Sequence, residues 1–171
     1  MHNSIRFILA GLLATGMVAC AKKVKEEPAP VSEAVAPVDT SPADTGAGRY
    51  SATDLDRVPC LMQRVVYFDF DRAEIRGEAQ EILRCHAKYL NDNATSRMTL
   101  EGHADERGSR EYNLGLGERR GNAVNSALQA NGASGSQITV VSYGEERPTC
   151  NESSESCWAQ NRRVEIVYTA K

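Results

Sequence analysis

The sequence lacks the features that most often mark an enzyme or a metal protein. It has three histidines, and no His-Glu-x-x-His or Cys-x-x-Cys pattern occurs. It also lacks the Gly-x-Ser-x-Gly turn of many hydrolases, and no cysteine and histidine share a recognisable catalytic context. We therefore expect no catalytic residue, no metal and no cofactor, and we favour a binding protein over an enzyme.

Basic residues are not in excess, because 20 Lys and Arg stand against 23 Asp and Glu, for a net charge of −3. This balance argues against a nucleic-acid partner. An internal repeat is missing as well. The longest apolar run, Phe7 to Val18, is too short to span a bilayer.

That apolar run follows Arg6 and ends at Ala19-Cys20, as in a secretory signal, so we predict a signal peptide over residues 1–19. Cys20 resembles the lipidated cysteine of bacterial lipoproteins, whose several acyl chains give stable anchoring. Ala rather than Asp follows it, which by the bacterial sorting rule indicates the outer membrane. The alternative is an ordinary signal peptide with an incidental cysteine.

Residues 20–53 read as a tether. Four of the six prolines lie between positions 21 and 50, and no apolar period occurs there. Such a segment is expected to be disordered, with a reach of about 30 Å as a coil and about 90 Å if extended. Residues 54–171 are long enough for one domain with a single core.

Within that domain, apolar periodicity predicts alternating strands and helices. Ser109 is a good N-cap for the second helix, and Asn131-Gly132 would end it. The expected strands are 64–68, 97–102, 137–143 and 163–169, and the expected helices are 78–90 and 111–130. This order predicts a two-layer α/β (α+β) domain.

One candidate site stands out in the stretch from Leu100 to Val124. Arg120 lies on the inward stripe of the second helix, where a guanidinium needs a partner, and the preceding loop offers Asp105. Together they could hold a ligand that carries both an ammonium and a carboxylate. The simpler alternative is a structural pair that ties the loop to the helix.

The motifs VVYFDFDRAEI, EGHADERGSREYNLGLGERR, VVSYGEERP and WAQNRRVEIVY occur in that order. With them the chain resembles the OmpA-like peptidoglycan-binding domain family over its whole folded part. The resemblance implies a mixed four-stranded sheet in β-α-β-α-β-β order with helices on one face. It also implies that Asp105 takes the ammonium and Arg120 the carboxylate of diaminopimelate in a peptidoglycan stem peptide.

Further site residues carried over from the resemblance are Phe70, Asp71, Arg107, Gly108 and Asn113. Amides near Gly108 and Ser109 would add donors for an anion at the helix N-terminus. Arg162 and Arg163 are expected to brace the loops rather than contact the ligand. Gly117 and Gly121 mark positions where the second helix comes close to a strand or to the ligand.

The resemblance further implies a lipid-anchored protein of the outer membrane, on its periplasmic face, that links this membrane to the wall. The spellings GERR and SYGEERP favour the branch of the family that works with the Tol system, so a Tol β-propeller protein is an expected partner. Alternatives are a family lipoprotein without a Tol role, a periplasmic receptor for free zwitterionic amino acids and, less favoured, a hydrolase.

Four cysteines remain besides Cys20, and an exported chain favours disulfides. Some OmpA-like domains carry a disulfide where Cys150 and Cys157 lie, so the resemblance implies a Cys150–Cys157 bridge. A second bridge would then join the remaining pair, Cys60 and Cys85. A buried free thiol at Cys85, or a link between Cys60 and Cys150, would be the alternatives.

Overall fold

The computed structural model describes residues 48–171. The predicted signal peptide, Cys20 and most of the predicted tether lie outside the described residues. The main chain of Tyr50 is already held by the end of the helix Ala79–Asp92, since its N–H donates to Asp92 Oδ2 at 2.8 Å and its carbonyl accepts from Nδ2 of the C-cap Asn93 at 3.0 Å. Packed structure therefore begins slightly before the predicted boundary at residue 54.

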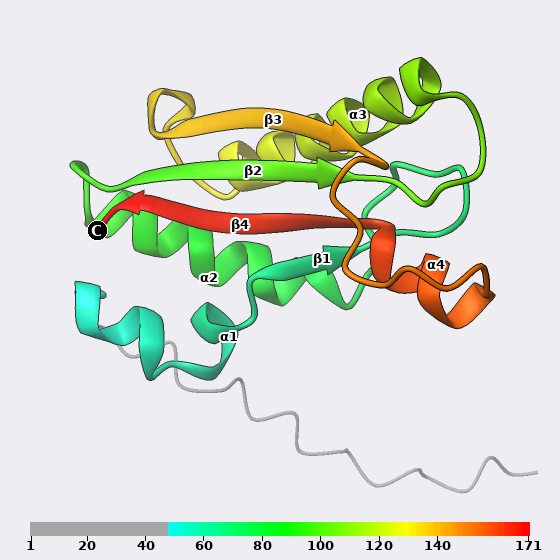
Figure 1. Ribbon diagram of the computed structural model, residues 1–171. Coiled ribbons are helices and arrows are strands. Elements are labelled where there is room, and N and C mark those ends of the chain that lie inside the picture. Colours follow the sequence, from blue (N-terminus) through cyan, green and yellow to red (C-terminus); the bar gives the residue numbers. More distant parts are fainter. Residues whose placement is uncertain (1–47) are drawn as a thin grey trace, which may run out of the picture. The chain divides into compact units, whose positions relative to one another are not determined.

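In chain order the elements are η1 (Ala52–Asp56), α1 (Pro59–Met62), β1 (Val65–Tyr67), α2 (Ala79–Asp92), β2 (Arg97–His103), α3 (Arg110–Ala130), η2 (Gly135–Gln137), β3 (Ile138–Gly144), α4 (Glu155–Asn161) and β4 (Arg163–Ala170). The four strands of this part of the chain form one sheet in the order β1-β4-β2-β3, and Figure 1 shows α2 and α3 together on one side of it. None of the described helices is long and apolar enough to cross a membrane.

Strand directions agree with the predicted mixed sheet. β2 and β3 are parallel and are joined by α3, whereas β4 runs antiparallel to both of its neighbours, β1 and β2. Consequently β1, β2 and β3 all end at the same edge of the molecule, at the right in Figure 1. The predicted fold class is confirmed. The short elements η1, α1, η2 and α4 were not predicted, because each is too short to show an apolar period.

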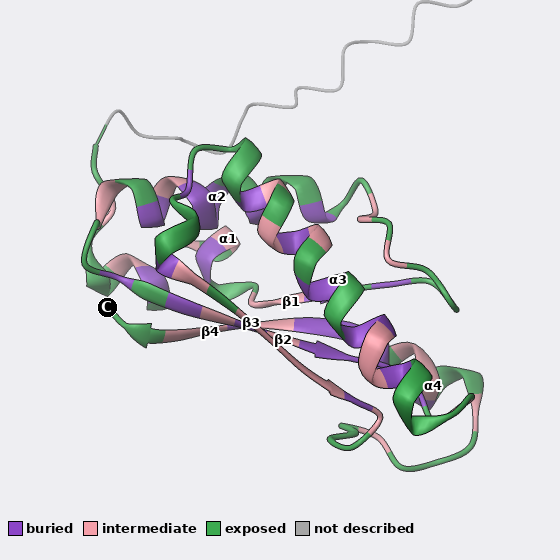
Figure 2. Ribbon diagram, turned by 90° about the horizontal axis from the view of Figure 1, so that it is seen from above, coloured by how far each residue is buried: buried purple, intermediate pink, exposed green. Residues whose placement is uncertain are grey.

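The core lies between the sheet and the two long helices, where Figure 2 shows buried residues on the facing sides of α3 and the strands. α2 contributes Leu83 and Leu90, and β2 contributes Leu100, all with no exposed surface. Val124 and Leu128 of α3 and Ile166 of β4 complete this layer. Burial of such side chains stabilises the fold by about 1.5–3 kcal/mol each.

Two glycines let α3 approach the sheet closely. A Cβ on Gly117 would lie 2.8 Å from the carbonyl oxygen of Gly102, and a Cβ on Gly121 would lie 2.5 Å from Cγ1 of Val140. Real side chains do not tolerate such distances without movement of the neighbouring atoms. The predicted close approach of the helix to the strands is therefore correct, and it draws Arg120, between these glycines, toward the end of β2.

Residues 48–171 contain two disulfides, Cys60–Cys85 and Cys150–Cys157, with Cα–Cα distances of 6.1 and 5.2 Å. The first ties α1 to α2. The second closes a short loop into the start of α4. Both pairings are those expected from the sequence, and Cys85 is not a free thiol.

Candidate ligand-binding site

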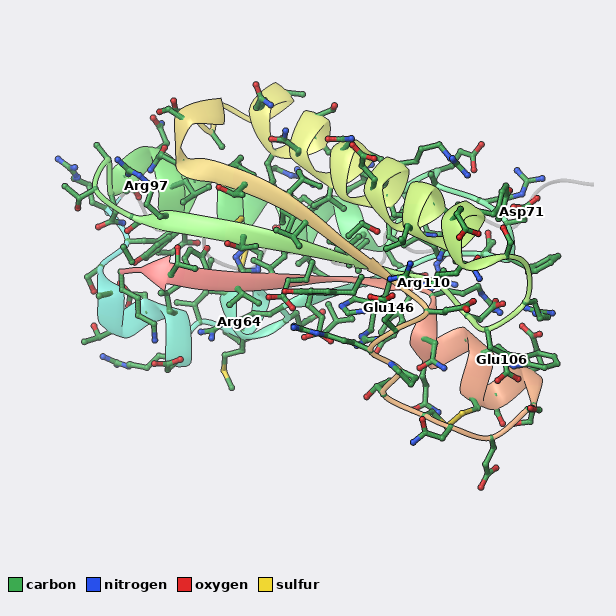
Figure 3. The ribbon with its side chains drawn as sticks, turned by 45° about the horizontal axis from the view of Figure 1, so that its top comes forward. Arg64, Asp71, Arg97, Glu106, Arg110 and Glu146 are labelled. Carbon is green, nitrogen blue, oxygen red and sulfur yellow. A yellow bond between two sulfur atoms is a disulfide. The ribbon has the colours of Figure 1, made fainter. Side chains whose placement is uncertain are left out.

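The loops that follow β1 and β2 meet the N-terminal end of α3 at one end of the domain. Figure 3 shows Asp71 and Arg110 near this end, and Glu106 beside α4. The arrangement follows from the sheet topology, because strands that run in the same direction release their loops at the same edge. Residues far apart in the sequence are thereby brought together.

A pocket of about 230 Å³ opens between these loops and α3. Its lining residues are Phe70, Asp71, Asp105, Arg107, Gly108, Tyr112, Asn113 and Leu116. Six of the predicted site residues thus share one pocket, and Arg120 is not among its lining residues. Phe70 and Tyr112 are 55% and 45% exposed, so the pocket has an aromatic rim open to solvent.

Asp105 is a nearly buried acidic residue of the pocket lining, only 4% exposed. Its carboxylate accepts two hydrogen bonds from the Arg107 side chain, at 3.0 and 2.8 Å, and one from Arg162 Nη1 at 3.3 Å. Burial alone raises the pKa of Asp105, but the hydrogen bonds from Arg107 and Arg162 outweigh burial and hold the pKa below its ordinary value. The group is therefore an anion at neutral pH.

Arg162 joins three segments around Asp105. Its Nε donates to the carbonyl of Phe68 at 3.1 Å, and its Nη2 donates to Glu155 of α4 at 2.7 Å. The bracing role predicted for Arg162 is confirmed, and it extends to direct contact with the candidate ligand-binding carboxylate. Arg163 donates to Glu165 and to the carbonyl of Arg147, which holds the start of β4.

Arg120 differs from the sequence expectation. It has no exposed surface, and its guanidinium donates to three main-chain carbonyls, those of Arg72 at 2.8 Å, His103 at 2.8 Å and Asp69 at 3.0 Å. Among the described residues, the ion pairs of Asp105 are with Arg107 and Arg162, not with Arg120. Burial lowers the pKa of Arg120 to about 10, which leaves it charged at neutral pH.

The physical reason is that a buried guanidinium must satisfy its donors, and loop carbonyls do so without burying a second charge. In this arrangement the N–H groups of the Arg120 guanidinium donate to carbonyls at the end of β2 and in the loop after β1, the two segments that lead to Phe70, Asp71 and Asp105. The sequence correctly predicted that Arg120 faces inward and needs partners. It did not indicate that the partners would be main-chain carbonyls.

The loop after β1 is held in an unusual conformation. Asp71 has φ of 56°, the only positive value among described residues other than glycine, and Tyr112 Oη donates to its carboxylate. Asp tolerates this left-handed region better than most residues. The contact between Asp71 and Tyr112 fixes one wall of the pocket against the first turn of α3.

The N-terminus of α3 forms another wall. Ser109 caps the helix, its Oγ accepting from the Tyr112 N–H at 3.2 Å, as the sequence predicted. Asn113 is 1% exposed and donates to the Arg107 carbonyl at 3.3 Å and to Glu145. The partial positive charge at this helix end favours an anionic group of a ligand.

Three residues with roles at the site were not identified as such from the sequence: Tyr112, Glu155 and Trp158. Tyr112 lies on an exposed helix position, and the other two lie on the unpredicted α4. Trp158 is the first residue of the WAQNRR motif, but the sequence did not indicate that its indole contacts the loop after β2. Among the described residues, no group of three His, Cys, Asp or Glu side chains could hold a metal ion.

A known protein family shares the part of the chain that contains this site. The model of the OmpA family matches residues 67–162, which include both loops, α3 and α4. The chain belongs to the OmpA family. This assignment covers all pocket-lining residues described above.

Curated relatives include the peptidoglycan-associated lipoprotein of Pseudomonas putida, 51% identical over 100 residues that cover 58% of this chain and 60% of that protein. The protein of the same name from Pasteurella multocida is 41% identical over 121 residues, 71% of this chain and 78% of the relative. This OmpA family chain thus spans about 60% of the length of the first of these relatives.

A crystal structure of the peptidoglycan-associated lipoprotein from Burkholderia pseudomallei superposes with a TM-score of 0.66 at 40% identity. The match covers 68% of this chain and 98% of that structure. The OmpA family fold found here is therefore the fold of a solved relative over nearly its whole length.

Proposed function

We propose that this protein is an outer-membrane lipoprotein that binds peptidoglycan non-covalently through diaminopimelate. It would link the outer membrane to the cell wall as part of the Tol–Pal system and support envelope integrity and cell division. Binding requires no bond to be made or broken, which agrees with a family of binding domains rather than enzymes.

The observation that carries the proposal is a nearly buried, ionised carboxylate in the lining of a pocket that opens to solvent. Asp105 is 4% exposed, yet it lines the pocket beside the N-terminus of α3. An ammonium group that enters the pocket gains a charge-assisted hydrogen bond in a partly desolvated position. The family match and the names of the relatives support the wall as the source of that ligand.

The ligand's carboxylate would be received by Arg107 and by amides at the start of α3. A guanidinium carries more N–H donors than the contacts of Arg107 to Asp105 and Glu155 engage, so donors remain for a second anion. The amides near Gly108 lie at a helix N-terminus, where an anion is favoured. Arg120 would contribute by holding both loops in position.

The exposed rim favours a polymer over a free amino acid as ligand. Phe70 and Tyr112 remain about half exposed at the mouth, so a stem peptide attached to a glycan chain could enter without being enclosed. A receptor for free amino acids usually buries most of its ligand's surface. We therefore favour wall binding over solute reception.

Partners and location of the whole protein belong to the same proposal. The lipidated Cys20 would hold the chain in the outer membrane, and the tether would let the domain reach the wall on the periplasmic side. The motifs GERR and SYGEERP support a Tol-system β-propeller protein as a second partner.

Co-sedimentation of the purified protein with sacculi that contain diaminopimelate tests the proposal. We expect the protein to pellet with sacculi and to be released by free meso-diaminopimelate but not by lysine, which lacks the second carboxylate. A protein that stays in the supernatant would contradict wall binding. Release by many amino acids equally would favour the receptor instead.

A further inference from the structure

The guanidinium of Arg107 lies between two aromatic rings from distant parts of the chain. Its central carbon is 4.0 Å from the ring centroid of Phe70 and 4.1 Å from that of Trp158. Contacts of this kind attract a cation to the ring face and restrict the orientation of the planar guanidinium. Phe70 belongs to the pocket rim, whereas Trp158 lies on α4 behind Arg107.

The N–H groups at the edge of the Arg107 guanidinium also have partners, in addition to the two rings against its faces. Nε and Nη2 donate to Asp105, and Nη1 lies 3.5 Å from Glu155. The side chain is 31% exposed, so it remains within reach of a ligand in the pocket. Position and plane of Arg107 are thus both determined before any ligand arrives, which reduces the entropy lost on binding.

Trp158 is itself held in place. Its Nε1 donates to Glu106 Oε1 at 3.0 Å, and the same oxygen accepts from Ser153. Glu106 directly precedes Arg107, so the indole is attached to the loop that it supports. In addition, Trp158 follows Cys157, whose bridge to Cys150 closes the loop before α4.

We infer that Trp158 is a positioning residue of the binding site: its indole, opposite Phe70, clamps Arg107 in the orientation that receives the ligand's carboxylate. This inference rests on the proposed function and extends it to a residue outside the pocket lining. Trp158 does not contact the ligand, and its contribution passes through Arg107.

A double-mutant cycle tests the clamp, with binding of a diaminopimelate-containing muropeptide as the readout. Loss of an aromatic partner from the partly exposed guanidinium of Arg107 is expected to weaken affinity about fivefold in Trp158→Leu. Trp158→Phe keeps a ring face and should recover most of that loss. In an Arg107→Ala background, Trp158→Leu should have no further effect. Tyr50→Leu, which removes a ring that lies 5.1 Å from Lys88 on α2, is the matched control and should bind like the parent.

An equal loss of affinity from Trp158→Leu with and without Arg107 would overturn the clamp, as would a Trp158→Phe variant as weak as Trp158→Leu. A parent protein that binds no muropeptide would instead refute the proposed function, and this inference with it.

Discussion

Arg120 Nη1 donates to the carbonyl oxygen of His103 at 2.8 Å, and this bond joins the middle of α3 to the end of β2. The same guanidinium reaches the carbonyls of Asp69 and Arg72 in the loop after β1. One buried side chain therefore holds both loops of the pocket, and it does so from outside the pocket.

Replacement of Arg120 is accordingly expected to act on stability first. Arg120→Met leaves three carbonyls without their donor and should lower the free energy of unfolding by about 2–5 kcal/mol. Binding to sacculi should fall as well, because the loops lose their common support. Denaturant unfolding monitored by circular dichroism, beside the co-sedimentation assay, measures both effects. A variant that keeps its stability but loses binding would show that Arg120 holds the ligand directly.

The two disulfides are expected to differ in their effect on binding. By restriction of the unfolded chain, the Cys150–Cys157 bridge contributes about 2 kcal/mol and the Cys60–Cys85 bridge about 3 kcal/mol. Removal of either pair by serine substitution should therefore lower the melting temperature. Only removal of Cys150–Cys157 should also weaken muropeptide binding, because Glu155 and Trp158 beside it hold Arg107.

The Cys60–Cys85 variant serves as the matched control for that experiment, since its bridge ties α1 to α2 away from the pocket residues. Calorimetry gives the melting temperatures, and titration with muropeptide gives the affinities. Equal affinities in the two serine variants would contradict a link between the second bridge and the site.

We expect His86 to make the stability of the domain depend on pH. It has no exposed surface, its ring nitrogens lie 2.8 Å from Tyr168 Oη and 2.9 Å from the Gln63 carbonyl, and burial lowers its pKa to about 4. The unfolded chain, with a histidine pKa of about 6.5, then binds more protons than the folded protein between these values. Stability is fully present above pH 6.5 and declines as the pH falls toward 4.

From pH 7.5 to pH 5.0 this single group should lower the free energy of unfolding by about 2 kcal/mol. His86→Gln cannot titrate, so its stability should lose that part of the pH dependence. Urea unfolding of both proteins at the two pH values measures the difference. Identical slopes in the parent and the variant would show that His86 does not cause the effect.

The anchor is tested at Cys20, which lies outside the described residues. Cys20→Ser removes the thiol that would carry the lipid. We expect the variant to leave the membrane fraction. Fractionation in high salt checks this, and membrane association that persists there would mean that something other than acyl chains holds the chain.

Much of the fold could be predicted from the sequence because its signals are local. Ser109 caps α3, Asn131 ends it, and the apolar residues of β2 and α3 repeat at the spacing of a strand and a helix. Gly117 and Gly121 conflict with helix propensity, and that conflict correctly indicated close packing against the sheet. By contrast, α4 has only seven residues in a polar segment, too few for a period to appear.

Six of the seven candidate residues from the sequence line one pocket, Arg120 being the exception, but the contacts of these residues were not predicted. The positions of Phe70, Asp71, Asp105 and Asn113 in the family motifs indicated that they belong to one site, and the structure places them in one pocket. The partners of each charge depend on loop geometry, which spacing along the chain does not determine. Because of this loop geometry, Asp105 forms its ion pair with Arg107 rather than with Arg120.

The most direct test of the account is the affinity of Asp105→Asn for a diaminopimelate-containing muropeptide, measured by calorimetric titration. Loss of one charge-assisted contact costs about 1.5–3 kcal/mol, so affinity should fall by about 10- to 150-fold. The amide is nearly the same size as the carboxylate, and circular dichroism should remain that of the parent. Glu118→Gln, at an exposed position of α3 outside the pocket lining, should bind normally. A folded Asp105→Asn protein that binds as tightly as the Glu118→Gln control would contradict the assignment of the site.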